Sequence, residues 1–494
     1  MFNYTSQNQL DIFNFRTEFE SKLDPKNRWV ILAKTLDWDA FASIYSKKFS
    51  STMGAKAVNA RIVIGALIIK HIENKDDRGT IEAIKENPYM QYFLGFDHFS
   101  SDAVFDPSLF VHIRKRLGND DFDKMNQIII SKSLNINIKN DISVENNDDN
   151  HNDDPAVNHK NSGKVQFDAT IADSDIKFPT DLSLLNDSRE KSEELLNFIC
   201  KSLAIETPRT YKRVARASWL NLSKSKKKSY KQIQIGIKKQ LNFLGRNLKN
   251  LDKIIEYNEM ILSELDKKQY KYLLVIKELY RQQLEMYQQK KHSISNRIVS
   301  IHQPHIRPMV RGKQGKNVEF GAKINVSLQG GYGRIDQLDF EAFNEGVCLK
   351  EQLERFKKLN GHYPEVVLTD QIYLNRENRK FLKDNNIRHT GKALGRRPKE
   401  ELNRYQKDKL KKERGERNHI EGKFGQGKSK YGLNNIKARL AKTSESWIAA
   451  IIFVMNILKL AKDYSFAFFY LLFGLLFFSE ITPRKNQKLI FIKI

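Results

Sequence analysis

The sequence has little cysteine, and this scarcity excludes two classes of small domain. Cys200 and Cys348 are too few for a disulfide framework, and no CxxC spacing offers a zinc site. The first residues also lack a basic segment followed by an apolar core, so we expect no signal peptide. These absences favour two buried thiols in a reducing compartment, the cytoplasm.

An apolar run long enough to cross a membrane is missing as well. The most apolar stretch covers residues 466–478, which is shorter than the roughly 17 to 25 residues that a spanning helix needs. We interpret it as part of a carboxyl-terminal tail, residues 464–494, that packs as a buried helix. A membrane anchor and a frame-shifted tail are the alternatives.

Acidic residues are in deficit. The chain of 494 residues has 59 Asp and Glu against 85 Lys and Arg, which gives a net charge of +26 and a pI near 9.6. Such an excess favours a polyanionic partner, nucleic acid first and an anionic membrane surface second. A solvated basic surface without a partner is the third interpretation.

The positive charge is concentrated in residues 209–239. This segment has no acidic residue, and its basic side chains alternate with Tyr211, Trp219 and Tyr230. Basic clusters interleaved with aromatic rings are typical of phosphate and base contacts. We therefore predict DNA-binding residues here, among them Lys226, Lys227 and Lys228.

Length and pattern predict several domains. Residues 1–138 are expected to form an all-α amino-terminal domain, with an apolar helix at 60–72 and a helix that begins at Asp106-Pro107. Residues 139–163 are rich in Asn and Asp and are expected to be a disordered linker.

Residues 164–463 have the strand and helix pattern of an α/β domain. Strands are expected at 164–169, 318–328, 333–340, 365–368 and 386–389, and a helix at 348–359. A helical insertion interrupts this domain at about 183–310. Within it, apolar residues at alternating spacings of four and three predict an antiparallel helical hairpin; they are Ile237, Leu241, Leu244, Leu248, Leu251 and Ile255.

Three carboxylates occupy positions suited to metal binding. Asp168 lies within the first apolar strand, where an unpaired acid is costly. Asp370 ends the strand EVVLTD, and Glu421 lies in the basic segment 407–430. Oxygen ligands that converge from two strands and a helix can hold two Mg²⁺ ions. Singly, each acid has an ordinary interpretation, as a turn residue, a helix N-cap and an ion-pair partner.

The surroundings of Glu421 add a specific pattern. Arg417 precedes it by four residues and Lys428 follows it by seven, so on a continuous helix all three project from about the same face. Gly422, Gly425 and Gly427 weaken that helix, which puts the position of Lys428 in question.

This spacing resembles the DDE-type insertion-sequence transposases whose catalytic helix reads Tyr-x2-Arg-x3-Glu-x6-Lys. Arg417, Glu421 and Lys428 match, whereas Arg414 stands at the tyrosine position. FDATIADSDIKFPTDLSLL and YPEVVLTDQIYLNRENRKFL are similar to the segments around the family's two aspartates, although Asp-x-Gly-Tyr becomes Asp370-Gln-Ile-Tyr373. RIVIGALIIKH and LFVHIRKRLG are similar to its amino-terminal domain.

The resemblance implies a ribonuclease H-like mixed sheet as the catalytic domain and a prokaryotic, nucleoid-associated enzyme. It implies that Asp168, Asp370 and Glu421 are catalytic and bind two Mg²⁺ ions, with Mn²⁺ as a substitute. Strand cleavage at the element ends would be followed by transfer to target DNA. Arg417 and Lys428 would contact DNA, and the partners would be double-stranded DNA and a second subunit, with no membrane.

Two other interpretations use the same residues. Gly422-x4-Gly427-Lys428-Ser429 has the form of a phosphate loop, but the basic residues before it are unlike a core strand. His302 and His305 are expected to lie in a loop after the insertion. A catalytically silent DNA-binding protein derived from a transposase is the alternative function, and cleavage assays with Mg²⁺ would separate it from an active enzyme.

Overall fold

The computed structural model describes residues 22–50, 56–142, 161–310, 318–392 and 403–478, with the side chains of 134–142 and 465–478 excepted. Most of the expected linker and the end of the tail, residues 479–494, lie outside the described residues.

Helices build the amino-terminal part of the chain. They are α1 (Arg28–Thr35), α2 (Trp38–Ser46), α3 (Ala60–Ile72), α4 (Asp77–Glu86), α5 (Pro88–Leu94), α6 (Leu109–Arg116) and α7 (Asn119–Ile142). Helix α6 begins later than predicted, because Asp106 accepts the Ser108 N–H at 2.8 Å and holds a turn before the helix. Arg114 at its end forms two 2.8 Å bonds with Asp77, so this basic side chain serves packing.

A mixed sheet forms the centre of the molecule. Strand β1 (Lys164–Asp173) runs antiparallel to β3 (Val318–Gln329) and parallel to β5 (Val366–Thr369), which pairs in parallel with β6 (Arg388–His389). On the other edge of β3 lie β4 (Tyr332–Asp339) and β2 (Arg307–Val310). The expected strands are present.

Strand β2 differs from the expectation, which places residues 307–310 at the end of the insertion. The segment is short and contains Pro308, which cannot donate a hydrogen bond along a strand. Its place at the edge of the sheet tolerates the missing donor, but no alternation of side chains marks it in the sequence.

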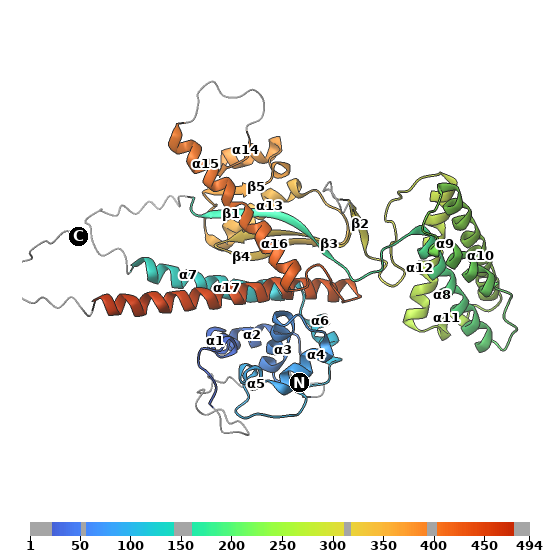
Figure 1. The fold of residues 1–494 in the computed structure, drawn as a ribbon, viewed down its shortest axis with the longest axis horizontal. Coiled ribbons are helices and arrows are strands. Elements are labelled where there is room, and N and C mark those ends of the chain that lie inside the picture. The colour runs from blue at the N-terminus through green and yellow to red at the C-terminus, as the bar shows by residue number, and fades with distance from the viewer. Residues whose placement is uncertain (1–21, 51–55, 143–160, 311–317, 393–402, 479–494) are drawn as a thin grey trace, which may run out of the picture.

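Helices cover both faces of the sheet (Figure 1). On one face, α13 (Glu345–Asn360) and α14 (Arg376–Asp384) bury Leu349 and Leu382 against Phe167 and Val367. On the other face, α7 lies beside α17 (Ala441–Phe478), which packs on β4. Helices α15 (Arg404–Glu416) and α16 (Asn418–Lys430) cross the sheet, with α15 against β5 and α16 against β1 and α17.

Helix α17 joins the amino-terminal helices to the sheet in one hydrophobic core. Phe453 contacts Phe41 at 5.4 Å and Phe122 at 5.6 Å between ring centres. Its apolar neighbours belong to the same cluster as Ile324 and Val326 of β3. The part of the helix at residues 441–464 is long and apolar enough to cross a membrane. However, 78% of its most apolar stretch is buried inside the protein. The apolar segments at 447–460 and 466–478 are parts of this one helix.

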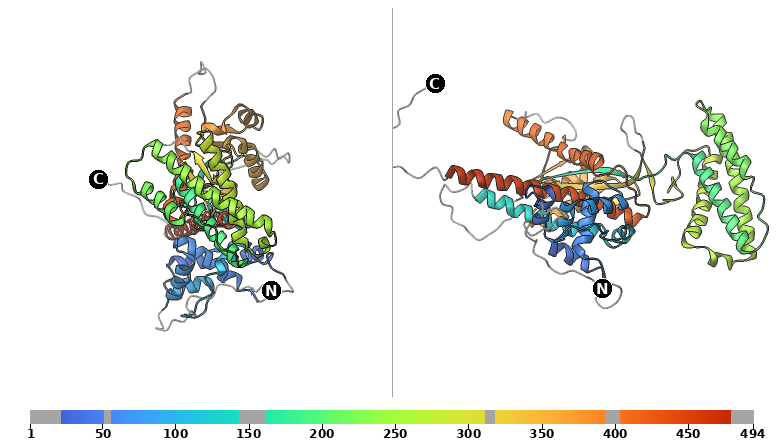
Figure 2. Two further views of the ribbon diagram at one scale, coloured as in Figure 1. Left: turned by 90° about the vertical axis from the view of Figure 1, so that its right-hand side faces the viewer. Right: turned by 60° about the horizontal axis from the view of Figure 1, so that its bottom comes forward.

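The insertion has a hydrophobic core of its own and lies to one side of the sheet (Figures 1 and 2). Its helices are α8 (Asp181–Ser202), α9 (Lys212–Lys224), α10 (Tyr230–Tyr257), α11 (Ile261–Glu264) and α12 (Lys267–Gln288). The predicted apolar seam of α10 is buried from Ile237 to Leu251. It packs on α8 as well as α12, so a helical bundle replaces the predicted two-helix hairpin.

Asn456 of α17 provides a test of the shared core. It accepts the Gly333 N–H at 2.9 Å and donates to Gly333 O at 2.6 Å and to Asn126 Oδ1 at 2.9 Å, all buried. Because Asn456→Ala leaves these groups unsatisfied, we expect it to lower the free energy of unfolding by roughly 2–4 kcal/mol in urea denaturation. Asn385→Ala, which removes one bond at a helix end, is the control. An equal loss in both variants would contradict the prediction.

Candidate active site

The register of the central strands brings Asp168 and Asp370 together. Parallel strands β1 and β5 pair Phe167 with Thr369. Asp168 follows Phe167 within β1, and Asp370 directly follows Thr369, the last residue of β5. Neighbouring strands lie about 4.8 Å apart, so the two carboxylates project from adjacent positions at the edge of the pairing. Asp168 lies inside β1, opposite Val326 of β3, which excludes its interpretation as a turn residue.

The electrostatic environment of Asp168 disfavours its charge. Burial is the main cause that raises the pKa of Asp168 to about 6, and the negative charges of Asp370 and Glu345 raise it further. The Ala169 N–H, which donates to Asp168 Oδ1 at 2.8 Å, and the Arg417 guanidinium oppose this rise. A carboxyl group held in this way gains from any cation that replaces the lost water.

Arg417 links the other two carboxylates. Its Nη1 lies 2.7 Å from Asp370 Oδ1 and its Nη2 lies 2.9 Å from Glu421 Oε1, and both acidic side chains are 53% exposed. Asp370 precedes a short 3₁₀ helix (Gln371–Tyr373) without capping it through its side chain, so an N-cap role does not explain this acid. Glu421 is indeed an ion-pair partner, and its pair reaches the second aspartate.

The three glycines do not interrupt α16, which continues to Lys430. At Gly427 a Cβ would lie 3.1 Å from Leu433, so the missing side chain permits close packing there. The side chain of Lys428 points towards β3 instead of the carboxylates, with its Nζ 3.6 Å from Glu319 Oε1. Glu319 lies roughly 20 Å along β3 from Val326, the residue opposite Asp168, so Lys428 does not join the carboxylate group.

Glu345, whose negative charge acts on Asp168, carries no clear signal in the sequence. Glu345 opens α13 behind the N-cap Asn344, and its carboxylate forms a 2.8 Å ion pair with Lys323 of β3. The predicted helix at 348–359 begins three residues after Glu345, whereas α13 begins at this acid, and an acid in the first turn of a helix is common for stability alone. Its proximity to Asp168 depends on the packing of α13 under the sheet.

The carboxylate oxygens of Asp168, Asp370 and Glu421 are chemically suitable ligands for a hard divalent cation. Within the described ranges, however, no group of three His, Cys, Asp or Glu is already arranged around a metal position. Arg417 neutralises Asp370 and Glu421 instead, while Asp168 keeps a raised pKa among neighbouring acids. Exposed carboxylate oxygens beside a buried one are ligands that Mg²⁺ accepts, so the residues fit such an ion in their chemistry.

The remaining candidates are placed as follows. Lys226, Lys227 and Lys228 lie exposed in the connection from α9 to α10, and Lys228 Nζ donates to Ser223 O at 3.1 Å. Arg414, at the position of the family's tyrosine, donates from Nε to Thr390 O at 3.2 Å. The tyrosine position is therefore used here to join α15 to the chain after β6.

The two competing motifs have other structures. The glycine-rich match at 422–429 lies wholly inside α16 and follows α15, whereas a phosphate loop must connect a strand to a helix. His302 lies in the loop after α12, as expected, and its Nδ1 is 2.7 Å from Tyr272 Oη. His305 lies in the same loop against Phe340, and burial lowers the pKa of its imidazole to about 4.

Comparisons with known proteins match both ends of the described fold. Residues 367–458 match the family "Transposase DDE domain", a range that includes Asp370, Arg417 and Glu421. Residues 17–116 match the family "Transposase domain (DUF772)", which corresponds to the amino-terminal helices. No solved structure matches the chain.

A relative from Rhizobium meliloti, an uncharacterized protein described as ORF8 in the nfe locus, is 26% identical over 202 residues. The match covers 41% of this chain and 86% of that protein. Its description names no activity, so the two domain matches carry the assignment. The two matched segments share one hydrophobic core, and through them the chain is similar to the DDE-type transposases of insertion sequences.

Proposed function

We propose that this transposase cleaves DNA strands at the ends of an insertion sequence and transfers them to target DNA by metal-dependent phosphoryl transfer. One observation carries the proposal: Arg417 joins Asp370 to Glu421 directly beside Asp168. Acids from two adjacent strands and a helix thereby gather at one edge of the sheet. The match to the DDE domain family supports the same activity.

The sheet order supports a ribonuclease H-like catalytic domain. Strand β1 is central. On one side lies β3, antiparallel to β1, followed by β4, antiparallel to β3; on the other side lie β5 and β6, both parallel to β1. On this interpretation the helical insertion, which follows β1 and ends before β2, is an addition to the common fold.

Asp168, Asp370 and Glu421 would hold two Mg²⁺ ions, for which Mn²⁺ would substitute. Bound there, the ions would activate a water and stabilise the attacking and leaving oxygens. The contribution of the chain is to place a buried carboxyl beside two exposed ones. Arg417 then becomes available for a DNA phosphate, because a guanidinium that pairs with carboxylates binds phosphate in the same manner.

DNA would contact several surfaces. Lys226, Lys227 and Lys228 extend from the insertion into solvent, Lys428 lies further along α16, and the amino-terminal helices match a transposase domain. We propose a homodimer on DNA as the working assembly, located at the nucleoid in the cytoplasm.

The carboxylates are tested by removing one charge at a time. We expect Asp168→Asn, Asp370→Asn and Glu421→Gln each to reduce nicking of end-bearing DNA by about 100-fold or more, because each loses a metal ligand. Binding of the same DNA should stay within about threefold of the unmodified protein, since the affinity comes chiefly from phosphate contacts elsewhere. Nicking and gel-shift assays on each preparation give both values, with EDTA as the metal-free control.

Asp384→Asn is the matched control, because Asp384 is an exposed acid at the end of α14. It should leave nicking unchanged. Full activity of any one of the three variants removes that residue from the proposed site. Binding without nicking by the unmodified protein would support the alternative function, a catalytically silent DNA-binding protein.

The proposed DNA contact of the insertion is tested by the salt dependence of DNA binding. Replacing Lys226, Lys227 and Lys228 together by Gln should flatten the plot of log K against log salt, by about 0.9 for each phosphate of duplex DNA that these lysines neutralise. The control replaces Lys253, Lys267 and Lys268, exposed lysines near the opposite end of α10 and the start of α12. Equal slopes for the two triple variants would assign residues 226–228 to a solvated surface.

A further inference from the structure

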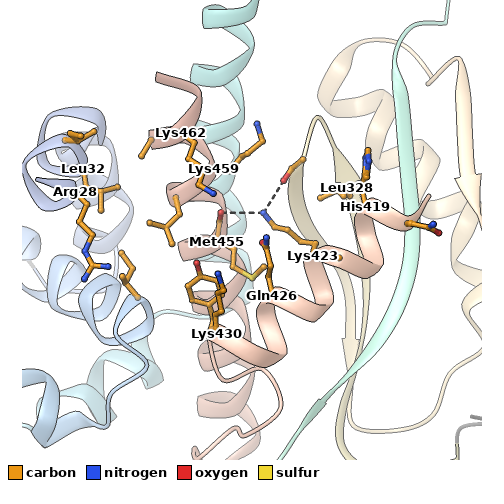
Figure 3. A pocket seen from close by; sticks show the side chains of 18 residues that line it. Arg28, Leu32, Leu328, His419, Lys423, Gln426, Lys430, Met455, Lys459 and Lys462 are labelled. Atoms are coloured by element: carbon orange, nitrogen blue, oxygen red, sulfur yellow. Dashed lines mark hydrogen bonds between the residues drawn. The ribbon is translucent and has the colours of Figure 1, made fainter. Parts of the chain in front are cut away.

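A large open cavity lies on the side of α16 that faces away from the carboxylates. Its volume is about 1100 Å³, and its walls come from α1, α16, α17 and the turn between β3 and β4. Ligand sites commonly have about 300–1,000 Å³. This space is therefore large enough for a group much bigger than a water molecule, at the junction of the amino-terminal helices and the catalytic sheet (Figure 3).

Basic side chains surround the cavity, and none of the described residues that line it is Asp or Glu. They come from three helices: Arg28, His419, Lys423, Lys430, Lys459 and Lys462. Acids behind the wall neutralise two of them, since Arg28 pairs with Glu73 and Lys459 with Asp463. In the described part of the chain, Lys430 and Lys462 have no such ion pair, and both are exposed.

Helix periodicity places the cavity opposite the proposed active site. At about 100° per residue, His419, Lys423, Gln426 and Lys430 form one stripe that lies about 180° from Glu421. One helix diameter, about 10–12 Å with side chains, therefore separates the carboxylates from this stripe. Lys423 Nζ is fixed at the base of the stripe by Gly331 O at 3.1 Å and Met455 O at 3.5 Å.

Apart from Asn418 and Gln426, the other side chains of the wall are mainly apolar. Leu32 of α1, Leu328 of β3 and Leu458 of α17 line it, and Tyr431 adds an aromatic ring at the end of α16. Cations around an apolar space with an aromatic ring suit a ligand that combines an anionic group with a flat, weakly polar one. A nucleotide has this composition, since its phosphate is anionic and its base stacks on aromatic and apolar surfaces.

We propose that this cavity binds single-stranded DNA, with phosphates against Lys430 and Lys462 and a base against the apolar wall. The inference rests on the proposed function for its source of single strands, which strand cleavage on the other side of α16 would supply. A strand released at the carboxylates has only to pass over one helix to reach the cavity. A free nucleotide has the same chemistry and is distinguished by the experiment.

The test measures binding of a fluorescent single-stranded oligonucleotide to the full chain by anisotropy, in EDTA over a range of salt. Lys430→Gln with Lys462→Gln should weaken binding roughly tenfold, because charged hydrogen bonds to phosphate are removed. The slope against log salt should fall by about 0.7 for each phosphate of the single strand that the two lysines neutralise. Lys380→Gln with Lys383→Gln, two exposed lysines on α14, is the matched control.

Competition identifies the source of the nucleotide. Unlabelled oligonucleotide should displace the labelled strand, whereas free deoxyadenylate should displace it only at far higher nucleotide concentration. Equal binding by the cavity pair and the control pair overturns the proposal. So does a cavity pair that loses deoxyadenylate binding but retains the oligonucleotide, because the ligand is then a free nucleotide. The absence of metal excludes cleavage, so failure of the proposed chemistry would not alter these results.

Discussion

The burial of α17 is the constraint on which the other parts of the structure depend. One side of the helix packs on the amino-terminal helices through Phe453, and another packs on β4, where Asn456 binds Gly333. Trp447, near its start, lies under the ammonium of Lys70 at 4.4 Å and the guanidinium of Arg114 at 5.1 Å. The two parts that match transposase families are thus joined in one folded body, because α17, which begins inside the second match, packs against the amino-terminal helices as well as the sheet.

This arrangement sets the position of α16 and hence of both of its faces. Ile420 and Phe424 are buried in the shared core, which leaves Glu421 directed to the sheet edge and Lys423 directed to the cavity beside α17. Arg417 stands at the junction of α15 and α16, where one guanidinium can reach acids on a strand and on a helix. The chemistry proposed here therefore depends on helix packing as much as on the carboxylates.

Features of the fold and the site that depend on local sequence patterns could be predicted from the sequence. Features that depend on packing between distant segments could not. The strands that carry Asp168 and Asp370, and the four-residue spacing from Arg417 to Glu421, were predictable from apolar runs and helix geometry. Strand β2 was not predictable because four residues with a proline have no period. The pairing of Lys428 with Glu319 and the proximity of Glu345 to Asp168 join segments far apart in the chain, and no local pattern records them.

The independent core of the insertion has a consequence for how the chain folds. Strands β1 and β3 are neighbours in the sheet, yet the whole insertion separates them in sequence, which makes their pairing a slow, non-local event. Since α8, α10 and α12 bury their own apolar side chains together, this bundle can form first. Once formed, it holds its two ends at a fixed separation and removes most of the loop-closure entropy that β1 and β3 would otherwise have to overcome.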